Sequence, residues 1–145
     1  MELSSHFSHD ELVHTDTSLP NECPDSLAAN ALTQAELLED CRVLVGPLHV
    51  SSWFRSTAVN TAVGGEPTSY HLLALATDVV PNGDASSAFR MLVASGIQYD
   101  KIILEKRKSY WLHIQSPKPG EKPRHQAFTS HVGANSRMEY EPFTV

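Results

Sequence analysis

The chain has 145 residues, enough for one domain of ordinary size that buries sufficient surface to fold without staples. Hydrophobic residues make up 41% of it and charged residues 19%. This composition is typical of a globular domain and argues against a disordered chain or a coiled coil. The formal net charge of −6 argues against a nucleic-acid-binding protein, because such proteins usually carry a basic excess. No apolar run approaches the roughly 20 residues that a membrane-spanning helix needs. We therefore expect neither nucleic acid nor a membrane as a partner.

The N-terminal residues 1–16 are polar and acidic, without the apolar region of a secretory signal. Cys23 and Cys41 form no CxxC motif, and two free thiols are favoured over a disulfide because a domain of this size needs no staple. The basic run 106–108 is expected to be the solvated tip of a hairpin rather than a phosphate-binding patch.

The first third of the chain predicts mainly helices. Residues 8–11 have the form of a capping box and open a short helical turn through Val13. From residue 25 to 45, apolar residues recur at helical spacing, and Gly46-Pro47 ends the segment. A further capping-box pattern at 33–36 leaves open whether this segment is one helix or two.

The remainder predicts short strands with two helices between them. Residues 56–63 favour a short helix ended by Gly64-Gly65, and Asp84 is a good N-cap for a helix through Ala94. Turn signals bound five runs that predict strands, at 48–54, 76–80, 101–105, 110–115 and 126–130. This order indicates an α+β fold in which N-terminal helices pack on a small antiparallel sheet.

Two of the eight histidines stand in contexts that suggest a function. His71 follows a polar loop and precedes an apolar stretch, and His113 alternates with Trp111 and Gln115 on one face of a predicted strand. The others have polar neighbours and are expected at the surface: His6, His9, His14, His49, His125 and His131. A lone histidine on a strand is more often structural than a ligand.

Asp78 changes that assessment, because it lies in the middle of an apolar strand. A buried carboxylate is costly unless it is paired or bound to a metal. Together with His71 and His113 it would give two imidazoles and one carboxylate, the usual three protein ligands of a catalytic zinc.

A zinc hydrolase also needs a base to activate water. Glu105 ends the predicted strand that precedes the strand of His113, and in a hairpin the two side chains could converge. The alternative is a strand-end glutamate that pairs with the neighbouring Lys106 or Arg107.

Several short motifs follow one another in a defined order. They are Ser52-Trp53-Phe54-Arg55-Ser56, Val59-Asn60, Val63-Gly64-Gly65, Ser69-Tyr70-His71, Ala76-Thr77-Asp78 and Trp111-Leu112-His113. This series resembles the core of the M15 zinc peptidases, the D-alanyl-D-alanine carboxypeptidases and related phage endolysins that share the hedgehog/DD-peptidase fold. The resemblance covers about residues 3–116 of a single domain spanning 1–145, and it leaves 117–145 as a C-terminal extension.

The resemblance implies roles for individual residues. His71, Asp78 and His113 would bind Zn²⁺, and Glu105 would be the general base that later protonates the leaving amine. Arg55 would stabilise the developing oxyanion or hold a substrate carboxylate. A further residue, Ser69, would support the substrate or a ligand; the alternatives are a surface salt bridge for the arginine and a turn or cap for the serine. The family's glycine between histidine and aspartate is replaced here by Ala74.

The function that the resemblance implies is hydrolysis of a peptide bond in bacterial peptidoglycan. The bond would be the terminal D-Ala-D-Ala bond or the L-Ala-D-Glu bond, and a monomer is favoured. The alternative is a non-catalytic, zinc-stabilised binding or structural module of a phage particle. A metal-free α+β domain is the weakest of these hypotheses. The expected setting is a phage-encoded protein, in the host cytoplasm or the virion, that acts on the cell wall.

Overall fold

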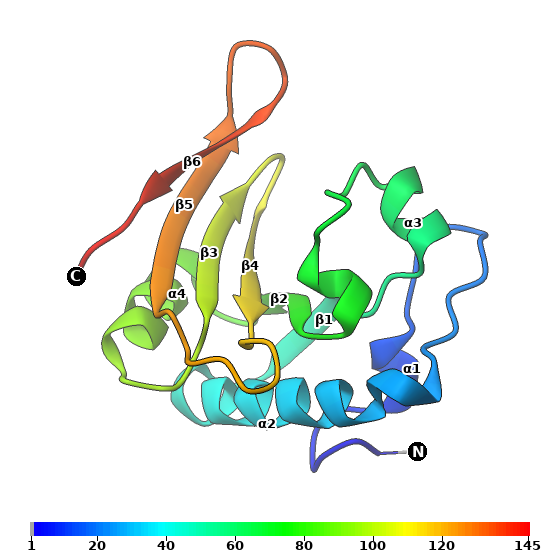
Figure 1. Cartoon of the computed structure of the whole chain (residues 1–145). Helices are drawn as coiled ribbons and strands as arrows, with labels where there is room; N and C mark the ends of the chain where they lie inside the picture. Colours follow the sequence, from blue (N-terminus) through cyan, green and yellow to red (C-terminus); the bar gives the residue numbers. More distant parts are fainter. Residues whose placement is uncertain (1) are drawn as a thin grey trace.

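The computed structural model describes residues 2–145 as one six-stranded sheet with helices packed against it (Figure 1). The helical elements are α1 (His9–Leu12), η1 (Asp25–Leu27), α2 (Ala28–Val45), α3 (Thr57–Ala62), η2 (Tyr70–Leu73) and α4 (Ala85–Ala94), where η marks a 3₁₀ helix. The strands are β1 (Leu48–Ser52), β2 (Ala76–Pro81), β3 (Lys101–Lys106), β4 (Tyr110–Gln115), β5 (Gln126–Val132) and β6 (Met138–Pro142). The predicted α+β class with N-terminal helices is confirmed.

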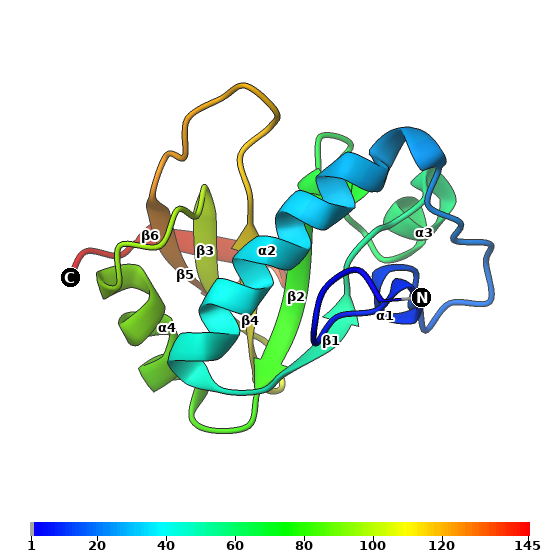
Figure 2. The ribbon, with the colours of Figure 1, turned by 90° about the horizontal axis from the view of Figure 1, so that it is seen from below.

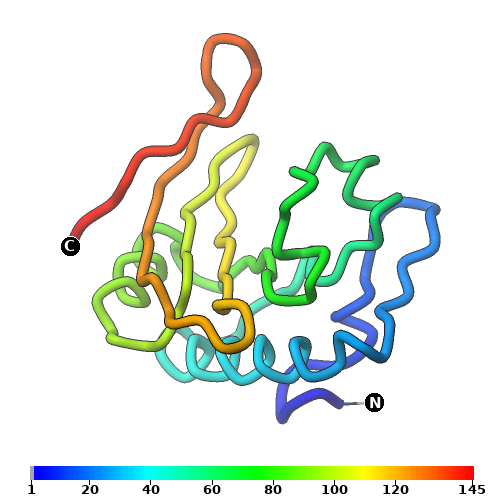
Figure 3. Tube along the Cα trace, viewed as in Figure 1, coloured from blue at the N-terminus to red at the C-terminus, as the bar shows by residue number. Residues whose placement is uncertain are grey.

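The sheet has the order β1-β2-β4-β3-β5-β6 and is mixed rather than wholly antiparallel. The pair β3–β5 is parallel, and the other four pairs are antiparallel. After β4, residues 116–125 pass the end of the sheet at which β3 begins (Figure 3). The chain therefore enters β5 in the direction opposite to β4, which is the direction of β3.

Most local predictions agree with the structure. The capping box is present, since the Ser8 hydroxyl accepts from the Glu11 N–H and the Glu11 carboxylate accepts from the Ser8 N–H at 3.0 Å. Residues 28–45 form one continuous helix, so the second capping-box pattern starts no new helix. Asp84 caps α4 by accepting from the Ser87 N–H at 2.8 Å.

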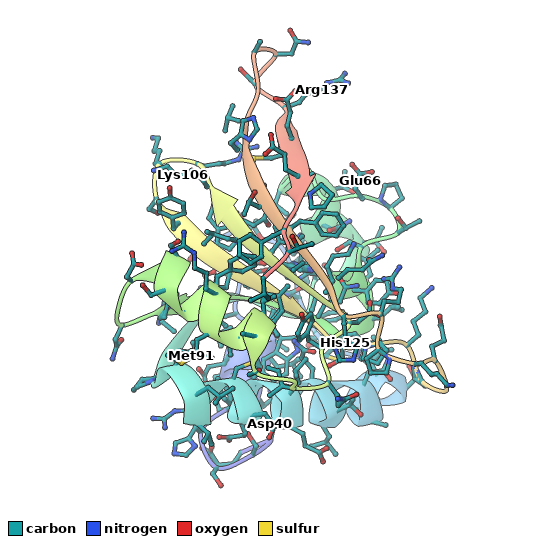
Figure 4. The ribbon with its side chains drawn as sticks, turned by 90° about the vertical axis from the view of Figure 1, so that its left-hand side faces the viewer. Asp40, Glu66, Met91, Lys106, His125 and Arg137 are labelled. Atoms are coloured by element: carbon teal, nitrogen blue, oxygen red, sulfur yellow. The ribbon has the colours of Figure 1, made fainter. Side chains whose placement is uncertain are left out.

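Three smaller predictions have clear outcomes. Cys23 and Cys41 are free thiols, as expected. The basic run 106–108 lies at the turn of the β3–β4 hairpin, and Figure 4 shows Lys106 at its outer end. Strand β6 was not predicted. Its residues alternate between apolar and polar from Met138 to Glu141, but the run is short, mostly exposed and followed directly by Pro142, which weakens the signal for a strand.

One face of the sheet is the core. Helix α2 runs across this face beneath β2, β4 and β3 (Figure 2), and α4 packs against the same strands. Strand residues of this core include Val79, Ile102, Leu104, Leu112 and Ile114. Because side chains alternate along a strand, Asp78, His113 and Glu105 lie on the opposite face. No helix among residues 2–145 is long and apolar enough to cross a membrane.

Trp53 anchors the segment that carries the first motif. Its side chain is fully buried, its indole N–H donates to the Ala74 carbonyl at 2.9 Å, and its ring meets Phe7 edge-on with centroids 6.5 Å apart. Ala74 itself adopts a left-handed conformation with φ 61°, which glycine accepts more readily than alanine. This conformation gives a physical reason for the glycine of the family pattern.

Gln34 ties α2 to two strands across the core. Its side chain is fully buried, and its amide group donates to the Thr77 hydroxyl at 3.0 Å and to the Ile114 carbonyl at 2.8 Å. Its amide oxygen accepts from the Ser116 hydroxyl. Every polar atom of this side chain therefore has a partner, which is the condition under which a buried amide stabilises a fold.

We predict that Gln34→Ala lowers the free energy of unfolding by about 2–4 kcal/mol, because it opens a cavity and leaves buried donors and acceptors unpaired. Urea denaturation followed by circular dichroism measures the change. Glu36→Ala is the matched control, since Glu36 is exposed on the same helix, and it should change stability by no more than about 0.5 kcal/mol. Equal effects of the two substitutions would contradict the role of the buried amide.

Candidate metal centre

The structure brings the three predicted ligands together from separate elements. His71 comes from η2, Asp78 from β2 and His113 from β4. One ligand atom of each lies within 4.8 Å of the others. Asp78 and His113 are direct partners in the β2–β4 register, so the sheet itself sets two of the three positions.

Main-chain contacts orient His71. The Ser69 hydroxyl accepts from the His71 N–H at 3.2 Å, which starts η2 at this point. The imidazole Nδ1 lies 2.6 Å from the Trp53 carbonyl oxygen, and a carbonyl only accepts, so Nδ1 carries the proton. Nε2 is left with its lone pair, 3.4 Å from Asp78 Oδ2. The structure thus shows Ser69 as a cap residue, and its contact with substrate stays a prediction.

His113 approaches the same carboxylate from the other side. Its Nδ1 lies 3.3 Å from Asp78 Oδ1, and its Nε2 lies 2.9 Å from Gln115 Oε1. The two imidazole rings are 5.3 Å apart between centroids and meet edge-on. The two rings therefore present different nitrogens to Asp78: Nε2 from His71 and Nδ1 from His113.

The charges at the centre favour a cation. Burial lowers the pKa of His71, and the charge of Asp78 only partly opposes this, so the ring is held in its neutral form. Burial alone would raise the pKa of Asp78, but the two histidines outweigh it and hold the pKa well below its usual range. For His113, the hydrogen bond and charge of Asp78 outweigh burial and raise the pKa.

This donor set fits zinc. Two imidazole nitrogens and one ionised carboxylate are a common triad for zinc in catalytic sites, where a fourth position stays open. Both histidines are also held through their second nitrogen, as is usual for histidines that bind metals. The geometry therefore supports the ligand assignment made from the sequence, while the identity of the metal stays a prediction.

Arg55 lies beside this centre and is not a surface residue. Its side chain is 15% exposed, and its Nη2 lies 3.1 Å from Asp78 Oδ2. Its Nε donates to the Ser52 hydroxyl at 3.1 Å, and its Nη1 donates to Asn60 Oδ1 at 3.3 Å. A β-carbon at Gly65 would lie 2.0 Å from the same Asn60 oxygen. Gly65, the second glycine of the Gly-Gly motif, therefore leaves the space in which Asn60 contacts the arginine.

Glu105 faces the same side of the sheet as His113. It pairs with Trp111, two positions before His113 on β4, so the two side chains are diagonal neighbours. The carboxylate is buried and accepts from the Ser130 hydroxyl at 3.1 Å. Burial raises the pKa of Glu105. The nearby charge of His113 opposes this shift, and the charge of Asp78 adds to it.

The alternative assignment of Glu105, an ion pair with Lys106 or Arg107, is not present among residues 2–145. The Lys106 ammonium instead lies 4.5 Å from the centre of the Tyr110 ring. Burial and the neighbouring Glu105 carboxylate raise the pKa of Tyr140 to about 12.

Some residues of the site were not identified from the sequence. Gln115 and Ser130 contact the predicted ligand His113 and the predicted base Glu105, and both belong to predicted strands. A signal existed for Gln115, which was placed on the same strand face as the histidine. Ser130 carried no such signal, because its partner strand β3 is its neighbour only in the folded sheet. The six remaining histidines are exposed, as predicted: His6, His9, His14, His49, His125 and His131.

Comparison with known proteins agrees with this geometry. A sequence model of the family described as Peptidase M15 matches residues 5–115, which include all three candidate ligands, Arg55 and Glu105. A search of curated proteins finds no match. The matched range ends at the last residue of β4, before β5 and β6.

We predict that His71→Ala abolishes stoichiometric zinc binding, because it removes one of three ligands. Zinc at about 1,000 times its Kd should stabilise the unchanged protein by about 4 kcal/mol, since binding to the folded state adds to the free energy of unfolding. The variant should show none of this gain in thermal denaturation with and without zinc. His49→Ala, at an exposed histidine of β1, is the control and should retain the full gain.

Proposed function

The chain belongs to the peptidase M15 family, and from this premise we propose that it is a zinc-dependent peptidase acting on the peptides of bacterial peptidoglycan. The observation that carries the proposal is the convergence of His71, Asp78 and His113 on one face of the sheet. Glu105 lies on that same face. Its carboxylate could serve as a general base, which a non-catalytic zinc domain would not need.

The cation, when bound, would act as a Lewis acid toward water and the scissile carbonyl. The protein's part is to present two imidazole nitrogens and one ionised carboxylate. The Trp53 carbonyl fixes which nitrogen of His71 is available, and Asp78 balances part of the positive charge.

Glu105 is the proposed general base. Burial raises its pKa, which brings it closer to the working pH and makes it a stronger base than an exposed glutamate. Once protonated, the same carboxyl group can donate its proton to the leaving amine. The hydrogen bond from Ser130 restricts its orientation, so the carboxylate is directed before substrate arrives.

Arg55 is the proposed electrostatic partner of the reacting carbonyl. A guanidinium is permanently charged and presents several donors in a plane, which suits an oxyanion or a substrate carboxylate. Its contacts with Ser52, Asn60 and Asp78 hold it in one orientation beside the cation position.

The substrate proposed is the peptide part of peptidoglycan, cut at the terminal D-Ala-D-Ala bond or at the L-Ala-D-Glu bond. Digestion of purified peptidoglycan, with and without a chelator, followed by mass spectrometry identifies the bond. Chelator-sensitive release of D-Ala, or new L-Ala and D-Glu ends, supports the proposal. An absence of products from a protein that holds stoichiometric zinc favours a zinc-stabilised binding or structural module instead.

We predict that Glu105→Gln retains zinc and lowers kcat/KM on these peptides by at least about 10²-fold, because the amide cannot accept the proton. Zinc content by mass spectrometry and product release by chromatography measure the two properties. Glu36→Gln makes the same chemical change at an exposed position and should leave both unchanged. Full activity of the Glu105 variant would remove this residue from the mechanism.

We also predict that Gly65→Ala impairs catalysis by displacing Asn60 and with it Arg55. A shift of about 1 Å in a positioned group can cost about 10²-fold in rate, so kcat/KM should fall by up to that factor while zinc stays bound. Gly83→Ala is the matched control, since a β-carbon there meets nothing within 4 Å. If the two variants are equally active, the space at Gly65 has no part in placing the arginine.

A further inference from the structure

A series of hydrogen bonds runs from His113 away from the cation position, through two buried side chains, to the half-exposed Arg124. His113 Nε2 meets Gln115 Oε1 at 2.9 Å, and Gln115 Nε2 donates to Asp100 Oδ2 at 2.9 Å. Arg124 completes the chain, with Nη2 2.7 Å from Asp100 Oδ2 and Nε 2.9 Å from Asp100 Oδ1. The exposed fractions of Gln115 and Asp100 are 3% and 1%, so water does not replace these contacts.

The Asp100 backbone is fixed independently of its side chain. Its N–H donates to the Gln115 carbonyl at 2.8 Å, and its carbonyl accepts from the Gln126 N–H at 3.0 Å. The Arg124 main-chain N–H also donates to the Asp100 carboxylate, at 3.2 Å. Asp100 is thus held between β4 and β5 at the point where β3 begins.

The hydrogen bonds from His113 through Gln115 to Asp100 can have only one donor-to-acceptor direction, because the Asp100 carboxylate is ionised. Burial would raise the pKa of Asp100, but hydrogen bonds from Arg124 and Gln115 outweigh it and lower the pKa. The ionised carboxylate only accepts, so it must face the amide NH₂ of Gln115. The amide oxygen then points at His113 and accepts from Nε2–H. Nδ1, the nitrogen that faces Asp78, is therefore the one that would bind the cation once it gives up any proton shared with the carboxylate.

We propose that Gln115, Asp100 and Arg124 form a support that fixes the tautomer and orientation of His113 and thereby sets the protein's affinity for zinc. Gln115 and Asp100 are positioning residues, and Arg124 acts on the ligand through both of them. The inference rests on the proposed zinc site. Arg124 lies beyond residues 5–115, so this support includes a residue outside the range that the family model matches.

The contrast with His71 makes the support testable. His71 is oriented by a main-chain carbonyl, which no substitution of Trp53 removes. His113 is oriented by a side chain. Gln115→Met keeps the length and approximate volume of that side chain but removes its hydrogen-bonding groups. Gln98→Met is the matched control, because Gln98 is exposed and donates only to the Gly96 carbonyl.

The experiment is a titration of each zinc-free protein with zinc in competition with a chromophoric chelator. We expect Gln115→Met to weaken zinc binding by about 10–100-fold, the usual effect of losing a partner of a metal-bound histidine. The control should stay within about twofold of the unchanged protein. Arg124→Gln should weaken binding in the same direction, because Asp100 then loses the charge that fixes the polarity of the chain.

A second measurement separates this role from a general loss of structure. Long-range ¹H–¹⁵N NMR of the zinc-loaded protein should show His113 protonated at Nε2, and Arg124→Gln should be folded by circular dichroism. Protonation at Nδ1, or unchanged zinc affinity in a folded Gln115→Met, would overturn the proposed support. If the unchanged protein binds no zinc in the same titration, the proposed metal site itself fails. The two failures are therefore distinguishable.

Discussion

The arrangement of the site depends on one buried carboxylate. Asp78 lies in the middle of β2, and both histidines and Arg55 approach it within 3.4 Å. A charge buried in this way is unfavourable without partners, so the strand can carry it only where cationic or metal-binding groups converge. The placement of η2, β4 and the segment before α3 around Asp78 follows from that requirement.

One face of the sheet forms the hydrophobic core, and the other carries the candidate site. Val79, Leu112 and Ile114 pack toward α2 and α4, while the residues beside them in sequence face the site. On β2 and β4 a candidate ligand and a core residue are therefore neighbours along the strand, and the packed core fixes the positions of Asp78 and His113. The same alternation places Glu105 on the site face and Lys106 away from it. The structure thus explains why the residue used in the proposed mechanism is the glutamate rather than its charged neighbour.

The last two strands extend the sheet beyond the segment that the family model matches. Ser130 on β5 contacts Glu105, and Arg124, just before β5, reaches Asp100. Both contacts depend on the parallel pairing of β3 with β5, which places the C-terminal segment beside Glu105 and Asp100. The C-terminal extension is consequently part of the site's construction rather than an appendage to it.

The sequence by itself determined the local elements and pointed to the candidate ligand set. Capping residues and apolar periodicity act within a few positions, so α1, α4 and the β3–β4 hairpin could be predicted. The candidate ligands followed from Asp78 in an apolar strand and from the resemblance to the M15 motifs. The parallel pair, the exposed strand β6 and the contact of Ser130 with Glu105 were decided only by the tertiary structure. They depend on which strands become neighbours after the chain crosses the end of β3, and neither periodicity nor spacing records that choice.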